Sequence, residues 1–231
     1  MLILVTGASK GIGLELVREF SEQGGCLVIA VSRNITPLLK LVREENTHSI
    51  LPLKADITNP QHVKKIVQTV VALELKLDVL VNNAGHIVNK PFESITSKEL
   101  SSVYATNVFA PFLLTQALLP VFNTRRAHVL NIGSMGGFQG SSKFAGLSAY
   151  SSSKMALAGL TECLAEELKG RSISVNCLAL GAVQTEMLGR AFPGYKAPLQ
   201  AHEMAVFIRD FALNGHRFFN GKVLPVSSTT P

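Results

Sequence analysis

The chain has 231 residues, of which 47% are hydrophobic and 16% are charged, and its formal net charge is +6. This length and composition suit one substantial core, so we expect a single domain over residues 1–231 rather than two small ones. No apolar run reaches the ~18 residues of a membrane span, and the basic residues are scattered without zinc-finger spacing or interleaved aromatics, which argues against membrane proteins and nucleic-acid-binding proteins.

The N-terminal sequence and the cysteines both favour a cytoplasmic protein. The apolar start MLILV leads directly into a glycine turn, without the basic region or cleavage site of a signal peptide. The three cysteines, Cys26, Cys163 and Cys177, are odd in number and lie in apolar surroundings, so we expect buried free thiols. No His or Cys pair has zinc-ligand spacing, and we expect no metal site.

Short β-branched runs alternate with amphipathic segments along the whole chain. This alternation is typical of βαβ units around a parallel sheet that helices cover on both faces. We therefore expect an α/β fold, a single-domain Rossmann-type doubly wound parallel sheet of about seven strands. The predicted strands, in chain order, are 2–6, 26–31, 50–55, 79–81, 128–132, 173–179 and 222–226. The clearest predicted helices are 13–22, 61–75, 97–119, 148–169 and 202–211, with a bend near Pro111 in the third.

Two looser stretches, residues 133–146 and 189–200, are Gly-rich or contain Pro and directly follow predicted strand ends. An open parallel sheet binds its ligand outside the carboxyl ends of its strands. We therefore expect both stretches to form part of a site, and residues 187–200 to shape a substrate pocket. Phe192 and Tyr195 in that segment predict an apolar and rather open pocket.

A glycine-rich turn, TGASKGIG, joins the first predicted strand to the first predicted helix. Gly7 permits a tight turn, Gly11 lets the backbone approach a phosphate, and Gly13 allows close packing of the helix. The free N–H groups at the start of the helix and the helix dipole attract an anion. The turn therefore predicts a phosphate-binding site, although its spacing is neither GxGxxG nor that of a nucleoside-triphosphatase loop.

Tyr150 and Lys154 are four residues apart on a predicted helix, which places a phenol and an ammonium on one helical face. A nearby cation favours the phenolate and lowers the pKa of a tyrosine from about 10. Such a tyrosine can exchange a proton with a substrate near neutral pH.

These segments resemble the short-chain dehydrogenase/reductase family. TGASKGIG is similar to its TGxxxGxG pattern, YSSSK to its YxxxK, and LVNNAG to its NNAG element. Asp56-Ile57 is similar to the residues that contact adenine in this family. Asn107 in ATNVFAPFLL and Ser134 in LNIGSMGG resemble its catalytic asparagine and serine. These motifs occur in the family's order over nearly the whole chain.

The resemblance implies a carbonyl reductase with Tyr150 as general acid/base. Lys154 would lower the pKa of Tyr150 and bind the nicotinamide ribose, Ser134 would hydrogen-bond the substrate oxygen, and Asn107 would hold a water in a proton relay. Thr185 resembles the threonine that holds the nicotinamide carboxamide. The implied cofactor site consists of Gly7, Ser9, Lys10, Gly11, Ile12, Gly13, Ser32, Arg33, Asp56, Ile57, Asn83, Ala84, Gly85, Tyr150, Lys154, Gly181, Val183 and Thr185.

The end of the second predicted strand, AVSRN, indicates which nicotinamide cofactor is preferred. An enzyme that prefers NAD holds the ribose 2′-hydroxyl with an acidic residue there, whereas this chain has Ser32. Arg33 and Lys10 resemble the basic residues that hold the 2′-phosphate in family members that prefer NADP. With no acid competing, we expect NADP(H) to be preferred over NAD(H).

The chain departs from the family pattern at two positions. Ser134 and Tyr150 are 16 residues apart where the family commonly has about 13, which requires the intervening loop to bulge. The family's Pro-Gly after the sixth strand is Leu180-Gly181 here, and we expect this change to loosen the turn near the nicotinamide.

We therefore expect an NADPH-dependent reductase of a small-molecule carbonyl substrate. Candidate substrates are 3-oxoacyl and similar keto compounds, and a substrate attached to an acidic carrier protein would suit the basic surface. The alternative is a catalytically impaired or non-catalytic NADP-binding regulatory protein. A serine acylase that uses Ser151 is disfavoured because its SDN and KTG motifs do not occur. The resemblance also implies a homodimer or homotetramer built through the helices that contain Asn107 and Lys154.

Overall fold

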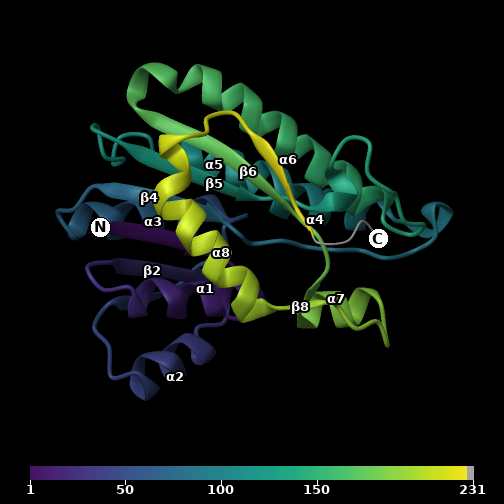
Figure 1. Ribbon diagram of the computed structural model, residues 1–231, viewed down its shortest axis with the longest axis horizontal. Coiled ribbons are helices and arrows are strands. Elements are labelled where there is room, and N and C mark those ends of the chain that lie inside the picture. Colours follow the sequence, from purple (N-terminus) through teal and green to yellow (C-terminus); the bar gives the residue numbers. More distant parts are fainter. Residues whose placement is uncertain (228–231) are drawn as a thin grey trace.

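Seven parallel strands form one central sheet in the computed structural model, which describes residues 1–227 (Figure 1). Their order across the sheet is β3-β2-β1-β4-β5-β6-β9. The strands are β1 (Leu2–Thr6), β2 (Leu27–Ser32), β3 (Ile50–Lys54), β4 (Leu77–Asn82), β5 (Ala127–Ile132), β6 (Ile173–Leu180) and β9 (Val223–Val226). All seven predicted strands are confirmed, with ends that differ by at most two residues.

Helices cover both faces of the sheet, which confirms the doubly wound architecture (Figure 1). On one face, apolar residues of α1 (Gly11–Glu22), α2 (Thr36–Glu44) and α8 (Ala201–Asn214) pack on the strands. On the other face, α3 (Pro60–Ala72), α5 (Ala110–Leu118) and α6 (Ser148–Glu167) form the second half of the core. Because both faces are buried, the strands consist of nearly continuous runs of Val, Ile and Leu.

The helix predicted over residues 97–119 is divided into three parts. Helix α4 (Ser97–Tyr104) starts with a capping box formed by Thr96 and Glu99, a π-helical turn follows over Ala105–Phe109, and α5 then continues. Pro111 lacks the N–H that would bind the Asn107 carbonyl in an α-helix, which accounts for the irregular turn before it.

Three short elements lie beyond the carboxyl edge of the sheet. They are β7 (Val183–Gln184), α7 (Glu186–Ala191) and β8 (Leu199–Gln200), and β7 pairs with β8 in a separate two-stranded sheet. The predicted substrate segment 187–200 is therefore partly helical. In Figure 1, α7 and β8 lie at the right, opposite the N-terminus.

The sheet order reverses direction between β1 and β4, because the chain first builds outward to β3 and then continues on the other side of β1. Ligands of doubly wound sheets bind outside the carboxyl ends of the strands at this reversal. The glycine turn follows β1 and the segment from Asn83 follows β4, so both lie at this place.

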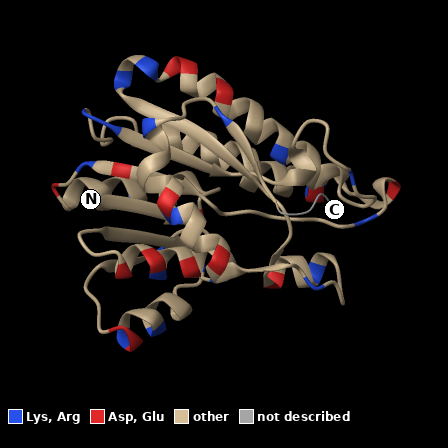
Figure 2. Cartoon of the chain, viewed as in Figure 1, with Lys and Arg blue, Asp and Glu red and all other residues tan. Residues whose placement is uncertain are grey.

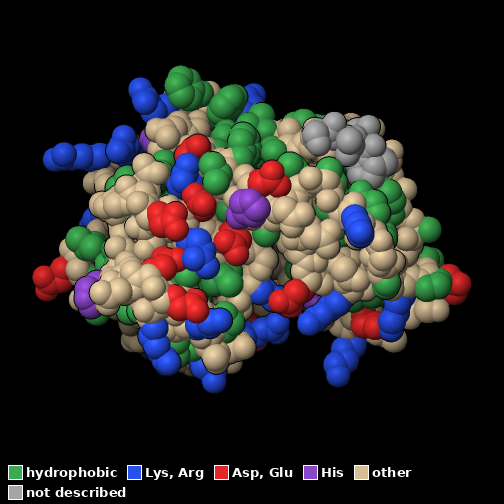
Figure 3. Space-filling view, turned by 60° about the horizontal axis from the view of Figure 1, so that its bottom comes forward, with side chains coloured by type: hydrophobic (Ala, Val, Ile, Leu, Met, Phe, Trp, Pro, Cys, Tyr) green, Lys and Arg blue, Asp and Glu red, His purple; other side chains and the backbone are tan. Residues whose placement is uncertain are grey.

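Charged residues lie mainly on the helices and the connecting turns (Figure 2). On the face shown in Figure 3, basic and acidic side chains are interspersed and do not form one basic patch. Among residues 1–227, none of the helices has the length and apolar character of a membrane span. The expectation for the cysteines was wrong in one case: Cys26 and Cys177 are buried, but Cys163 lies on the exposed side of α6.

Candidate active site

The glycine turn after β1 folds tightly against the segment that follows β4. Gly7 has φ +66°, and a Cβ on it would lie 2.7 Å from the Ala84 Cα. The Thr6 hydroxyl accepts hydrogen bonds from the N–H groups of Asn83 and Ala84, both at 3.1 Å. The Asn83 side chain donates to the Thr6 carbonyl at 2.9 Å and to the Gly7 carbonyl at 3.3 Å. Two of the sequence motifs thus form one hydrogen-bonded unit.

Helix α1 starts at Gly11 and directs its first N–H groups toward a cavity of about 460 Å³. No side chain in the described part of the protein caps this helix. Gly11, Ile12 and Gly13 line the cavity, as the anion site predicted from the sequence requires. Gly11 has φ +53°, and a Cβ on it would contact Thr185 at 3.3 Å, so the turn also lies close to the segment after β6.

The end of β2 contributes Ser32 to the same cavity, and its hydroxyl donates to that of Ser9 at 2.7 Å. Lys10 and Arg33 both line the cavity, where the sequence placed them. The end of β2 carries no acid, as expected, but an acid from a distant segment pairs with Lys10. The Glu186 carboxylate lies 3.7 Å from the Lys10 ammonium, and both side chains are about half exposed.

Asp56, after β3, lies at the edge of this half of the cavity. Its carboxylate accepts hydrogen bonds from the Thr58 N–H at 2.9 Å and the Thr58 hydroxyl at 2.7 Å. Burial opposes ionisation, but these bonds and the nearby Arg33 guanidinium hold the pKa of Asp56 below its ordinary value. The Asp56 carboxylate is therefore ionised and held in place by the two hydrogen bonds from Thr58. Ile57 lines the cavity beside it.

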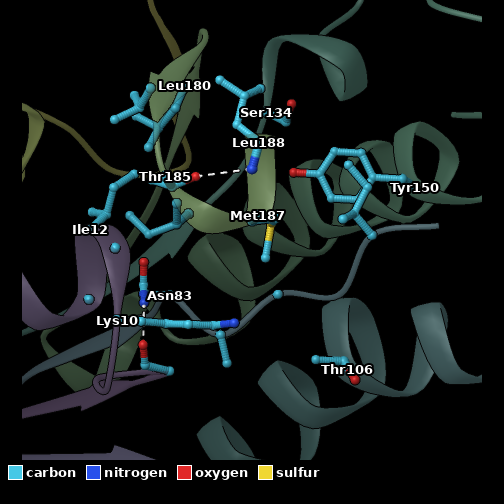
Figure 4. Close-up of a pocket in the computed structure, with 18 of the residues that line it drawn as sticks. Lys10, Ile12, Asn83, Thr106, Ser134, Tyr150, Leu180, Thr185, Met187 and Leu188 are labelled. Carbon is cyan, nitrogen blue, oxygen red and sulfur yellow. Dashed lines mark hydrogen bonds between the residues drawn. The ribbon is translucent and has the colours of Figure 1, made fainter. Parts of the chain in front are cut away.

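At the other end of the cavity the structure brings Tyr150 of α6 together with Ser134, which follows β5 (Figure 4). Lys154 of α6 lines the cavity beside Tyr150. The Tyr150 hydroxyl points into the space that Ser134, Thr185 and Leu188 border (Figure 4). The Lys154 ammonium lies 5.9 Å from the centre of the Tyr150 ring and donates to the Ile132 carbonyl at 2.7 Å. Lys154 is only 4% exposed.

The loop between Ser134 and Tyr150 contains a 3-10 turn over Met135–Gly137, packed directly on α6. A Cβ on Gly137 would lie 2.6 Å from the Lys154 Cβ, so this residue has to be glycine for the loop to lie so close. The bulge expected from the 16-residue spacing lies farther along the loop, where Gly140 and Gly146 both have positive φ. The extra residues therefore leave the side chains of Ser134 and Tyr150 next to each other.

The direction of the Tyr150 pKa differs from the prediction. Burial raises the pKa of Tyr150, and a hydrogen bond with Ser134 offsets only part of that rise. Burial also lowers the pKa of Lys154 to about 8. Because the two groups share a desolvated site, burial shifts the pKa of each toward its neutral form, and the cation does not make the phenol acidic in the protein alone.

Asn107 lies in the π-helical turn, fully buried, and behind the cavity rather than in its lining. Its carboxamide accepts from the His86 N–H at 2.8 Å and donates to the His86 carbonyl and the Ser153 hydroxyl, both at 2.9 Å. This side chain fixes the segment after Gly85 against α6. A water in a proton relay near Asn107 stays a prediction.

The turn after β6 is firmly held, contrary to the loosening expected from Leu180. Leu180 is the last residue of β6 and pairs in register with Val226, and the Gly181 N–H donates to the Val226 carbonyl at 2.9 Å. Unlike proline, leucine can extend the ladder by one residue. Thr185 lines the cavity and accepts from the Leu188 N–H at 3.2 Å, which leaves its hydroxyl hydrogen free to donate.

All of the residues predicted to bind the cofactor line this one cavity, together with Ser134. The sequence reasoning missed several other lining residues, whose positions depend on the tertiary fold. They include Thr106, Leu147 and Glu186, whereas Met135 and Phe144 lie in the predicted stretch 133–146, and Leu188, Phe192 and Tyr195 lie in the predicted segment 187–200. Lys10 pairs with Glu186, and Phe144 contacts Phe192, 48 positions away. Contacts between residues so far apart leave no local pattern in the sequence.

Comparisons with known proteins agree with this geometry. A family model described as short chain dehydrogenase matches residues 1–196. The 3-oxoacyl-[acyl-carrier-protein] reductase FabG of Thermotoga maritima is 31% identical over 206 residues, which cover 88% of this chain and 80% of that protein.

Two solved structures are similar over almost their full lengths. A short chain dehydrogenase from Burkholderia cenocepacia in complex with NADP has a TM-score of 0.86 and 25% identity, and the match covers 99% of this chain and 96% of that one. A 4-hydroxyisoleucine dehydrogenase complexed with NADH has a TM-score of 0.85 and 22% identity, with 98% and 96% covered. The similarity to the 4-hydroxyisoleucine dehydrogenase, at 22% identity, shows only that the two proteins share a fold.

Proposed function

Because this chain belongs to the short chain dehydrogenase family, we propose that it is an NADPH-dependent oxidoreductase that reduces a carbonyl compound to an alcohol. The observation that carries this proposal is the cavity with two chemically different ends. One end has the open N–H groups of α1 and two basic side chains, and the other has the hydroxyls of Ser134 and Tyr150. A cofactor with a phosphate group at one end and a reactive ring at the other fits such a cavity.

In this proposal the chain holds the substrate oxygen and supplies a proton to it. The cofactor supplies the hydride to the carbonyl carbon. Ser134 and Tyr150 both donate hydrogen bonds to the carbonyl oxygen, and Tyr150 then transfers its proton as negative charge develops there. The raised pKa of Tyr150 keeps the phenol protonated at neutral pH, which is the form an acid in a reduction needs. Lys154, whose pKa is about 8, is mostly charged at pH 7 and stabilises the resulting phenolate.

Tyr150→Phe tests this role, because it removes only the hydroxyl. We expect turnover of NADPH with a ketone to fall by about 10²–10⁴-fold, the usual contribution of a general acid, with little change in NADPH affinity. Tyr104→Phe is the matched control, since the Tyr104 hydroxyl bonds Ser152 outside the cavity. Equal turnover in the wild type and Tyr150→Phe would refute the proposal. Tight NADPH binding without turnover of any carbonyl would instead indicate the non-catalytic regulatory protein.

The preference for NADP(H) over NAD(H) is also proposed from the chain's own residues. Ser32 stands where a carboxylate would repel a 2′-phosphate, and Lys10 and Arg33 lie beside it in the cavity. The B. cenocepacia structure is described as a complex with NADP, and the similar dehydrogenase described above as a complex with NADH, so the fold alone does not select between them.

The cofactor preference is tested by titrating wild type, Arg33→Ala and Lys10→Ala with NADPH and NADH. Loss of one charge-assisted contact costs about 1.5–3 kcal/mol, so the affinity for NADPH should fall roughly tenfold or more while that for NADH changes little. Glu186→Gln should tighten NADPH binding, because it removes the acid beside Lys10. Arg43→Ala on α2 is the control, and an unchanged NADPH affinity in Arg33→Ala and Lys10→Ala would contradict the assignment.

We also propose a homo-oligomer that pairs the helices containing Asn107 and Lys154. Large apolar side chains of α4, the π-helical turn, α5 and α6 are between 44% and 56% exposed: Leu100, Phe109, Phe112, Leu113 and Met155. Covering such a surface against a second copy of the chain removes it from water.

A further inference from the structure

The half of the cavity that faces Tyr150 is walled by three segments distant in sequence. They are residues 86–91 after β4, residues 138–147 in the lengthened loop after β5, and residues 187–196 after β7. The Asn89 side chain donates to the Ala191 carbonyl at 2.7 Å, and the Lys90 N–H donates to the Gly146 carbonyl at 3.0 Å. The wall is therefore assembled before a substrate binds.

Two phenylalanines meet where the second and third segments join. The rings of Phe144 and Phe192 have centroids 6.3 Å apart and planes at 70°, an edge-to-face contact. Both line the cavity, and Phe144 belongs to the loop that contains the extra residues between Ser134 and Tyr150. Met187, Leu188 and Leu147 extend this apolar surface toward Tyr150.

Apart from the buried Lys154 beside Tyr150, the charged residues that line the cavity lie away from Phe144 and Phe192. Of the described residues that line it, Lys10, Arg33 and Asp56 belong to the end with the glycine turn, and Glu186 pairs with Lys10. Lys154 is buried and donates to the Ile132 carbonyl. Lys90, Lys143, Arg190 and Lys196 belong to the three segments but do not line the cavity, so the lining near Phe144 offers no cation to a carboxylate or phosphate, and it has few hydrogen-bonding groups for a polyhydroxylated chain. Burying such groups there without partners would cost binding free energy.

On the basis of the proposed reductase function, we propose that the substrate is an uncharged carbonyl compound whose apolar or aromatic group packs against Phe144 and Phe192. Its carbonyl oxygen lies between Ser134 and Tyr150. The loop insertion thus acts as a determinant of specificity, because it brings Phe144 to the wall that the substrate segment forms with Phe192.

The test compares kcat/KM with NADPH for benzylacetone, acetone, levulinate and dihydroxyacetone. We expect benzylacetone to be reduced at least tenfold more efficiently than levulinate and dihydroxyacetone. Phe144→Ala and Phe192→Ala should each lower the benzylacetone-to-acetone ratio of kcat/KM about tenfold, mainly through KM, and Phe144→Leu should restore part of it. Phe218→Ala is the matched control, since Phe218 is 74% exposed and lies outside the cavity.

A preference for levulinate or dihydroxyacetone, or a benzylacetone-to-acetone ratio unchanged in both Ala variants, would overturn this inference while leaving the reductase intact. Bound NADPH without reduction of any of the four compounds would refute the reductase. In that case calorimetric titration of benzylacetone into the complex of the protein with NADP⁺ still tests whether the wall binds an apolar group. Binding that Phe144→Ala weakens supports the apolar wall, and no binding to the wild type overturns it.

Discussion

Replacing Gly13 by alanine should damage both the fold and the cofactor end of the cavity. A Cβ at this position would overlap the Gly7 carbonyl oxygen and the Asn83 amide nitrogen. Neither is the flexible end of a long side chain, because one is backbone and the other is held by the Thr6 and Gly7 carbonyls. The added methyl group therefore has to separate α1 from the segment after β4.

The size of the effect follows from these contacts. Overpacking of a close-packed site costs about 1–3 kcal/mol, and loss of the two Asn83 hydrogen bonds adds about 0.5–1.5 kcal/mol each. Allowing for partial relaxation, we expect Gly13→Ala to lower the free energy of unfolding by about 2–4 kcal/mol. Urea denaturation at constant m-value measures this directly. NADPH affinity should fall as well, because Gly13 belongs to the lining.

Gly159→Ala provides the control within the same protein. Gly159 lies inside α6, and a Cβ there would meet no atom within 4 Å. Alanine is the better helix former by about 0.8–1.0 kcal/mol, so this variant should be more stable than the wild type. A Gly13→Ala variant with the urea midpoint of the wild type would show that the turn after β1 adapts freely, and the reasoning from close approach would then be wrong.

Three further predictions concern buried and exposed groups elsewhere. Burial lowers the pKa of His128 to about 4, below the unfolded value near 6.5, so the stability it contributes is complete above pH 6.5 and should decline by about 3 kcal/mol toward pH 4. His128→Gln should flatten this part of the dependence of unfolding free energy on pH, and an identical dependence in the variant would count against it. Lys154→Met should stabilise the fold by about 1–3 kcal/mol at pH 7, because it removes a buried cation, and it should abolish reduction. Urea midpoints measure the stability and turnover of NADPH measures the reduction. A variant less stable than the wild type would contradict the expected stabilisation. Phe112→Asp should shift the mass measured by light scattering toward the monomer, and an unchanged mass would exclude the proposed apolar face.

The short-range features of the site were predictable because local sequence alone produces them. Tyr150 and Lys154 lie four residues apart in α6, and helical geometry places them together. The strands followed from their continuous apolar runs, and the turn that contains Gly7 and Gly11 followed from residues that tolerate positive φ. The motifs also predicted which loops meet at the cavity, because the carboxyl ends of parallel strands share one edge of the sheet.

The tertiary structure alone decided the environment of these residues. Burial raises the pKa of Tyr150, whereas the i, i+4 spacing by itself predicted the opposite, because desolvation depends on everything packed around the phenol. Glu186 lies beside Lys10, and Phe144 meets Phe192, across gaps in sequence that no local pattern reports. Periodicity and turn propensity act over a few neighbouring residues and so determine the elements. Burial, pairing of charges and the shape of the substrate wall arise from contacts between elements, and these exist only once the chain has folded.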